Sequence, residues 1–206
     1  MSTEKRVLVL ETQLDADPTS LRSQKEFMRI LGTAYAHRGL EVSTKEVHSR
    51  ADFLFFLELA RRNAYYMVHF VGHGNKTSKD TSIRFSNGES LILSGSDVSV
   101  FKDLNVPILI FSCCSVGKDQ ETIDQLMRRS GAKAVFAYAV TLYDYQAFII
   151  DSMIYHLLFG DVPKAEENMF LDEIGNRVKN AIEELLLYRR GRGGGKKVLA
   201  YSIADF

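Results

Sequence analysis

The chain has 206 residues, of which 46% are hydrophobic and 25% charged, and it contains only three prolines. Its length matches one domain of about 100–200 residues, and its apolar content excludes disordered, collagen-like and low-complexity chains. Basic and acidic residues number 26 each, so the net charge is zero and no broad field attracts nucleic acid or an anionic membrane. We therefore expect a single domain over residues 1–206, with neither nucleic acid nor membrane as a direct partner.

The two cysteines, Cys113 and Cys114, are adjacent and cannot form a disulfide framework. Free thiols are typical of a reducing compartment, so we expect a cytoplasmic location. The apolar run at residues 7–10 is shorter than the roughly 7–15 apolar residues of a signal peptide. No run reaches the roughly 18–20 residues that cross a bilayer, so no targeting or membrane-spanning segment is expected.

Strands and helices are predicted to alternate along the chain. After the first strand, Asp17-Pro18 predicts a helix entry, and apolar residues follow at helical spacing up to Gly39. Strands are predicted at residues 6–11, 40–47, 65–71, 106–111, 133–140 and 198–203, and further helices at 51–62, 144–159 and 168–188. Because parallel neighbours need crossover helices, this pattern predicts an α/β three-layer sandwich, with a mainly parallel sheet of about six strands and helices on both faces.

Two irregular stretches interrupt this alternation. Between Ile83 and Leu93, an Asn-Gly pair flanked by apolar residues predicts a small hairpin excursion from the sheet. Residues 189–197 read RRGRGGGKK. We interpret them as a flexible basic linker, in preference to a processing site or a contact for a partner.

Chemically reactive side chains follow two of the predicted strands. One strand runs out into Gly72-His73-Gly74, and another runs out into Ser112 and the two cysteines. In open parallel sheets, catalytic groups gather at the carboxyl ends of the strands. If the two strands are neighbours, an imidazole and a thiol face one another at one sheet edge.

A histidine beside a cysteine is sufficient for acyl transfer, because it removes the thiol proton and later protonates the leaving amine. The attack creates an oxyanion, for which the backbone N–H groups of Gly74 and Cys114 are candidate donors. Glycine at 72 and 74 would allow close backbone approach and positive φ. Consecutive strand residues point to opposite faces, so only one of Cys113 and Cys114 can face His73.

The cysteines and histidines also have interpretations other than catalysis. A buried free cysteine is more often a small core residue than a nucleophile. A metal site is not expected, because His69 and His73 on one strand lie about 13 Å apart at 3.3 Å per residue. The phosphatase, P-loop and dinucleotide-binding spacings are missing, so no cofactor is expected.

An apolar strand ending in His-Gly, followed by one ending in a small residue and Cys, resembles the caspase-type cysteine peptidases. This fold group includes caspases, metacaspases, gingipains, separases and bacterial CHAT domains. Here the two motifs are HFVGHG at residues 69–74 and IFSCCSVG at residues 110–117. A caspase histidine lies about 50 residues before its cysteine, and His73 precedes Cys114 by 41.

Bacterial CHAT domains are the most similar of these groups. Their histidine motif often has an earlier histidine, matched by His69, and their cysteine motif places the nucleophile at Cys114. An Asp and a later aromatic residue, common after the next strand, are matched by Asp144 and Tyr155. Cys113, Val116 and Ile154 differ from the residues that CHAT domains usually have at the corresponding positions. The resemblance implies structural roles for Asp144 and Tyr155, and for His69 a role in packing or orienting the strand.

Metacaspases recognise a basic substrate side chain with an acidic residue two positions before the cysteine. Here that position is Ser112, so an Arg or Lys preference is not implied. The loop after the first strand offers charged residues instead, and we expect Ser112, Glu11 and Asp15 to contribute to substrate binding.

The sequence hypothesis is a cysteine endopeptidase that cleaves protein substrates through a His73–Cys114 dyad and an acyl-enzyme. The resemblance further implies activation by a partner protein or ligand, in a bacterial defence or cell-death pathway. One alternative is a catalytically silent caspase-like module for interaction or signalling. A second alternative is a flavodoxin-like domain that binds a small molecule.

Overall fold

The computed structural model describes residues 5–13, 23–160, 176–177, 180 and 199–203. The predicted helix at 168–188 and the interpretation of residues 189–197 fall almost wholly outside these ranges, as does Asp15. None of the described helices is long and apolar enough to cross a membrane.

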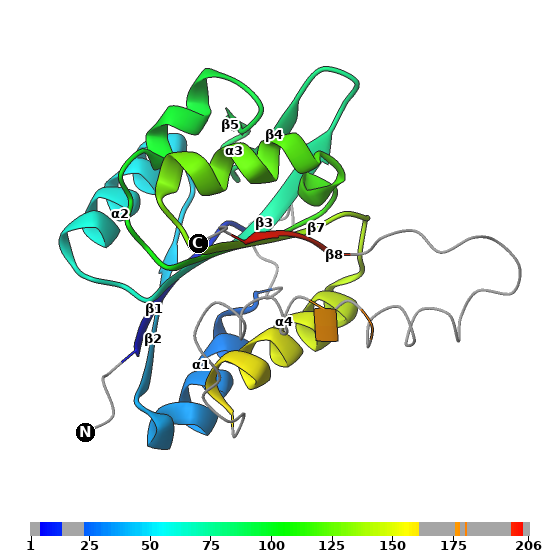
Figure 1. The fold of residues 1–206 in the computed structure, drawn as a ribbon. Helices are drawn as coiled ribbons and strands as arrows, with labels where there is room; N and C mark the ends of the chain where they lie inside the picture. Colours follow the sequence, from blue (N-terminus) through cyan, green and yellow to red (C-terminus); the bar gives the residue numbers. More distant parts are fainter. Residues whose placement is uncertain (1–4, 14–22, 161–175, 178–179, 181–198, 204–206) are drawn as a thin grey trace, which may run out of the picture.

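A six-stranded, mainly parallel sheet forms the centre of the fold, as predicted (Figure 1). Its strands, in chain order, are β1 (Lys5–Glu11), β2 (Leu40–Glu46), β3 (Met67–Lys76), β6 (Ile108–Cys113), β7 (Ala134–Tyr138) and β8 (Leu199–Ile203). In space the order is β2-β1-β3-β6-β7-β8, and only β8 pairs antiparallel with its neighbour. Strands β3 and β6 are therefore adjacent at the centre of the sheet.

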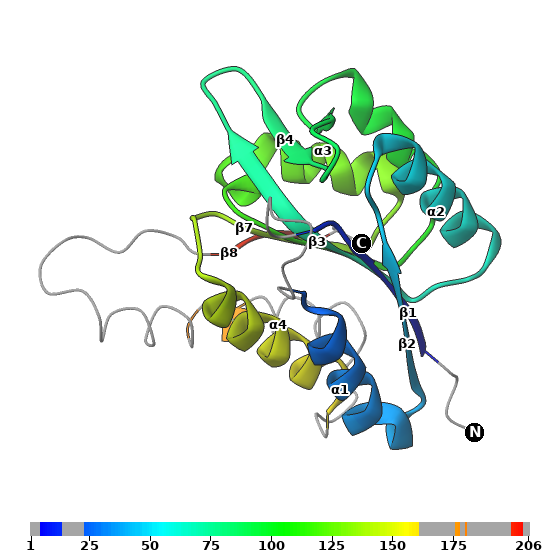
Figure 2. The ribbon, with the colours of Figure 1, turned by 180° about the vertical axis from the view of Figure 1, so that it is seen from behind.

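Helices cover both faces of the sheet. Helices α1 (Lys25–Tyr35) and α4 (Asp144–Phe159) lie on one face, and α2 (Arg50–Arg62) and α3 (Gln120–Ser130) lie on the other (Figures 1 and 2). The described residues also form three short 3₁₀ helices: η1 (Ala36–Arg38), η2 (Ser96–Phe101) and η3 (Val116–Lys118). The three-layer α/β sandwich is confirmed.

The core consists of two apolar layers, one on each side of the sheet. Along β1, Leu8 and Leu10 pack with the α2 and α3 side, while Val7 and Val9 pack with the α1 and α4 side. All four are fully buried, as expected for a central strand with an alternating side-chain direction.

A capping interaction marks the start of α2. Ser49 precedes the helix, its hydroxyl accepts the Asp52 N–H, and the Asp52 carboxylate accepts the Ser49 N–H in return. This reciprocal pair satisfies two of the unpaired donors at the helix start.

Helix α3 was not predicted from the sequence, although its signals are present. Asp119 caps its start, and Gly131 ends it with a φ of 71°. Ile123 and Leu126 are buried at helical spacing between these caps. The short segment between two strongly predicted strands was assigned no element, and the helix fills it.

The predicted hairpin is present as β4 (Thr81–Arg84) and β5 (Ser90–Ile92), joined by a turn in which Gly88 has a φ of 91°. Strand β4 pairs antiparallel with the second half of β3, from His73 to Lys76. The expectation that β3 ends at residue 71 is therefore wrong. The strand continues because β4 supplies hydrogen-bond partners after β3 leaves the parallel sheet.

Asp119 joins three parts of the structure at the start of α3. Its carboxylate accepts the Thr122 N–H of its own helix, the Lys76 ammonium of β3 at 2.6 Å and the Thr81 hydroxyl of β4 at 3.0 Å. Burial disfavours ionisation and is the largest single influence, but the hydrogen bonds together outweigh it and lower the pKa of Asp119 to about 2.

This geometry predicts a specific loss of stability in acid. A carboxyl with a lowered pKa in the folded state stabilises the fold fully above its unfolded pKa of 3.8. Its contribution then falls as the pH drops towards 2. We expect Asp119→Asn to flatten the fall in unfolding free energy between pH 4 and pH 2, measured by urea denaturation. Asp124→Asn, whose carboxylate accepts from Gln120 on the same helix, should leave the slope unchanged, and an equal effect of both variants would contradict the prediction.

Candidate functional site

His73 lies where β3 changes partners, at the carboxyl-end edge of the parallel sheet. Up to Gly72 the strand pairs with β6, and from His73 onward it pairs with β4. The side chain is exposed. Alternation along β3 places it on the same face as His69, which is the face covered by α4.

Cys114 follows the last residue of β6 and is partly buried. Cys113 has no exposed surface and belongs to the core layer on the α2 and α3 side. Burial raises the pKa of the Cys113 thiol well above its usual value, which keeps it protonated and a poor nucleophile. The expectation that one of the two cysteines packs in the core is met by Cys113, and Cys114 is the more accessible thiol.

The register of β3 and β6 brings the two candidate residues together. Gly72 pairs with Cys113, and His73 and Cys114 each lie one position further along their strands. Neighbouring strands are about 4.8 Å apart, so the two backbones are adjacent at one edge. Among the described residues, no hydrogen bond joins the His73 ring to the Cys114 sulfur.

Gly74 is in close contact with the cysteine segment. A Cβ at this position would lie 2.5 Å from the Cys114 carbonyl oxygen and 2.8 Å from both the Cys113 Cβ and a Val116 methyl. Neither Gly72 nor Gly74 has a positive φ, so the structure does not use the conformational freedom that glycine permits at these positions. Close approach does hold for Gly74, but the backbone that approaches is that of the chain itself.

The loop after β7 contacts the Cys114 sulfur. The Leu142 N–H donates to Sγ at 3.4 Å, and the Leu142 carbonyl oxygen lies 3.8 Å from the same sulfur. Ser115 adopts a left-handed φ of 65°, uncommon for a residue other than glycine, and its N–H donates to the Val140 carbonyl at 3.1 Å. The turn after Cys114 is therefore held by the same loop that contacts its sulfur.

A fully buried polar network lies on the α4 face behind this edge. The His69 ring bonds to the Tyr155 hydroxyl through Nδ1 at 3.1 Å and to the Ser112 hydroxyl through Nε2 at 2.7 Å. The Ser112 and Tyr138 hydroxyls both donate to Oδ1 of Asp151, at 2.7 and 2.6 Å. Oδ2 of Asp151 has no hydrogen-bond partner among the described residues and lies 3.7 Å from Nε2 of His69.

Burial controls the protonation of this network. It lowers the pKa of His69 to about 3, so the ring is neutral at physiological pH. It raises the pKa of Asp151 to about 7, against the opposing effect of the two hydroxyl donors. His69 has no exposed surface, as expected for a residue that orients the strand, and it does not act as an exposed base.

Two of the residues predicted to bind substrate, Ser112 and Glu11, lie at the carboxyl ends of their strands but are buried and hydrogen-bonded within the chain. Ser112 is 6% exposed, and its hydroxyl is engaged in the buried network. Glu11 is 4% exposed, and its carboxylate accepts from the Ser23 hydroxyl and the Gln24 N–H at the start of α1. Asp15 lies outside the described residues.

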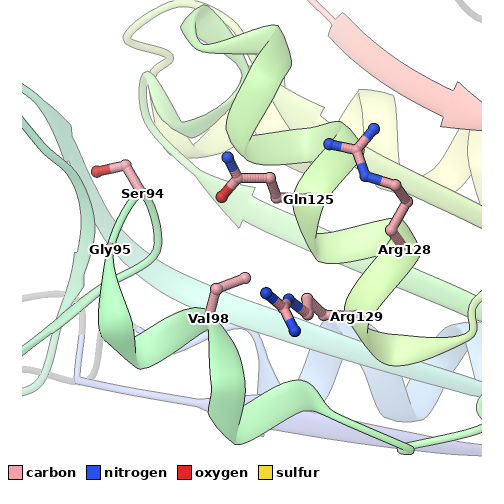
Figure 3. Close-up of a pocket in the computed structure, with 6 residues that line it drawn as sticks. All are labelled: Ser94, Gly95, Val98, Gln125, Arg128 and Arg129. Atoms are coloured by element: carbon pink, nitrogen blue, oxygen red, sulfur yellow. The ribbon is translucent and has the colours of Figure 1, made fainter.

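A cavity of about 590 Å³ lies between η2 and α3. Figure 3 shows Ser94, Gly95 and Val98 along one wall and Gln125, Arg128 and Arg129 of α3 along the other. It belongs to the α2 and α3 side of the sheet, whereas the Cys114 sulfur contacts the loop that leads into α4. The cavity is separate from the candidate site.

Sequence reasoning missed three contributors to the site region. Asp151 lies at helical spacing from the apolar residues Ala147 and Ile154 of α4, and this was a usable signal because a carboxylate among buried residues needs a hydrogen-bond partner. Tyr138 ends the buried strand β7 and was given no role beyond its place in the strand predicted at residues 133–140. Leu142 contributes through its backbone, for which the sequence offers no signal.

Comparison with known proteins gives a family match and similar solved structures. The family described as peptidase family C25 matches residues 10–203. The crystal structure of the Drosophila initiator caspase Dronc is similar with a TM-score of 0.62 and 13% identity, over 96% of this chain and 79% of that chain. The C-terminal domain of the coenzyme A biosynthesis bifunctional protein CoaBC has a TM-score of 0.39 and 15% identity, over 76% of this chain and 97% of that one. Among curated proteins, none matches the chain.

Proposed function

The chain belongs to peptidase family C25 and is a cysteine peptidase with a caspase-like fold, and on this basis we propose that it is an endopeptidase in which His73 and Cys114 form the catalytic dyad. The observation that carries the proposal is their placement, one position beyond the Gly72–Cys113 pair of adjacent strands. Cys113 is a core residue and is not available as the nucleophile.

In the proposed reaction, His73 takes the proton of the Cys114 thiol, and the sulfur attacks the carbonyl carbon of a peptide bond. The resulting oxyanion accepts hydrogen bonds from the N–H groups of Gly74 and Cys114. His73 then protonates the leaving amine as the C–N bond breaks, which leaves a thioester on Cys114. Water, deprotonated by His73, hydrolyses the thioester and restores the free thiol.

Leu142 assists this chemistry through its backbone. Its N–H donates to the Cys114 sulfur at 3.4 Å, and its carbonyl oxygen lies 3.8 Å from the same sulfur. These two contacts hold the sulfur in place at the edge of the sheet.

The substrate is proposed to be a protein. Ser112 and Glu11 are engaged in interior hydrogen bonds, so we assign neither of them to a pocket for a basic side chain. We further propose that a partner protein or ligand activates the peptidase, and that it acts in bacterial defence or cell death. We also propose a relationship to the bacterial CHAT domains. Free Cys113 and Cys114 support a cytoplasmic location.

Labelling with a panel of peptidyl electrophilic ketones tests the proposal. We expect a covalent adduct on Cys114, mapped by mass spectrometry, that forms on the Cys113→Ala variant and is lost on His73→Ala. Adduct formation needs an activated thiolate, so the dependence on His73 separates a dyad from an exposed thiol.

Two results would count against the proposal. Equal labelling with and without His73 would mean that Cys114 is only an accessible thiol. No labelling, under any condition that includes candidate activators, would favour the catalytically silent module.

A further inference from the structure

We propose that Asp151 is a positioning residue, which holds the ends of β3 and β6 through Ser112 and His69 so that His73 and Cys114 face each other. This inference rests on the proposed dyad. It assigns a role to a buried carboxylate that neither the sequence motifs nor the proposed chemistry uses.

The network reaches both strands close to the candidate residues. His69 lies four residues before His73 on β3, and Ser112 lies two residues before Cys114 on β6. Both spacings are even, and residues two or four positions apart along a strand point to the same face. His69 therefore shares a face with His73, and Ser112 shares a face with Cys114. Asp151, on α4, is thus connected to both strands from the side on which the dyad lies.

The hydrogen bonds have one consistent direction. A neutral His69 ring has one donor nitrogen and one acceptor. Because the single Ser112 proton goes to Asp151, Nε2 of His69 donates to Ser112 and Nδ1 accepts from the Tyr155 hydroxyl. Oδ1 of Asp151 accepts at the end of this chain, whether the carboxyl is ionised or protonated on Oδ2. The chain of donors thus joins β3 to β6 through side chains, in addition to their backbone pairing.

Burying this network has an unfavourable effect on the free energy of folding, because its polar groups lose contact with water. Asp151 has no exposed surface, and its Oδ2 lacks a hydrogen-bond partner among the described residues. Apolar side chains would fill the same volume at lower cost, since a buried carboxyl is poorly solvated. Features that break local stability rules are expected at functional sites, and this one lies directly behind the Cys114 edge.

The test measures how fast iodoacetamide alkylates Cys114 between pH 5 and pH 9, in the full chain with Cys113→Ala as background. If the strand ends are released, His73 no longer favours the thiolate, so Ser112→Ala and Asp151→Ala should each slow alkylation at pH 7 about tenfold. Asp151→Asn keeps the Oδ1 acceptor and should retain a rate within about twofold of the parent.

Ser130→Ala is the matched control. Ser130 is a buried serine like Ser112, but its hydroxyl bonds to backbone atoms and not to side chains, and it ends α3 on the other face of the sheet. Thermal unfolding records the stability of every variant. A purely structural role predicts that Ser112→Ala and Ser130→Ala lower the melting temperature while leaving the rate of Cys114 alkylation unchanged.

The outcomes separate this inference from the proposed function. Parent-like alkylation in folded Ser112→Ala, with slow alkylation in His73→Ala, would overturn the positioning role and leave the dyad standing. Parent-like alkylation in His73→Ala would overturn both. If Asp151→Ala does not fold, Ser112→Ala and Asp151→Asn decide the question.

Discussion

Replacing Cys114 with alanine is expected to abolish peptide cleavage while leaving the fold intact. The expected loss is at least about 1,000-fold in kcat, because the sulfur forms the acyl-enzyme and no neighbouring group replaces it. The side chain is only partly buried, so its removal leaves no large cavity in the core. The measurement is the turnover of a substrate identified by the ketone panel, alongside thermal unfolding.

Cys113→Ala is the control, since it removes an identical group one position away. Cys113 packs in the core and its sulfur lies 3.9 Å from the Phe70 carbonyl oxygen, so some loss of stability is expected. Catalysis should survive. His73→Ala should match Cys114→Ala, because both residues act in one step and their losses are not additive. Activity that survives Cys114→Ala and falls in Cys113→Ala would assign the nucleophile to the other thiol.

Much of the sheet was predictable, because its strands carry a strong local signal. Strand β1 is a short apolar run bounded by charged residues, and helix α4 was predicted with the bounds that the structure shows, Asp144–Phe159. Buried strands and long apolar helices are the elements that periodicity identifies best. The candidate dyad was also predictable, since it needs only strand ends and the rule that parallel strands present their carboxyl ends at one edge.

What the sequence did not predict depends on contacts between distant segments. The extension of β3 to Lys76 depends on pairing with β4, which no local pattern of residues 73–76 reveals. Likewise, Glu11 was interpreted as a charged residue open to substrate. The structure places its carboxylate at the start of α1, where it accepts the Gln24 N–H, and burial there raises the pKa of this carboxyl.

The polar network shows the same limit for the site. Ser112, His69 and Asp151 come from three elements, and their hydrogen bonds form only once α4 packs on the sheet. Sequence spacing identified His69 and Ser112 as positions of interest, but it could not indicate that one carboxylate joins them. Sequence motifs therefore identify reactive side chains more readily than the buried residues that hydrogen-bond to their neighbours.

Gly74→Ala should separate the two halves of the candidate site. The added Cβ would lie 2.5 Å from the Cys114 carbonyl oxygen, which is backbone and cannot rotate away. The strand and the cysteine segment must then move apart. A displacement near 1 Å at reacting groups costs about 100-fold in rate, and overpacking of this kind costs roughly 1–3 kcal/mol of stability. Turnover and urea denaturation measure the two effects.

Gly95→Ala provides the matched comparison, because it adds the same methyl group where the structure has room. The nearest atom to a Cβ there is an Ile92 methyl at 3.5 Å, and the φ of Gly95 is −137°. Its stability should change by no more than about 0.5 kcal/mol and its turnover not at all. If Gly74→Ala proved as harmless as Gly95→Ala, the close approach of β3 to the cysteine segment would not be what holds His73 and Cys114 together. The support would then have to come from the α4 side alone, where Asp151 joins the same two strands.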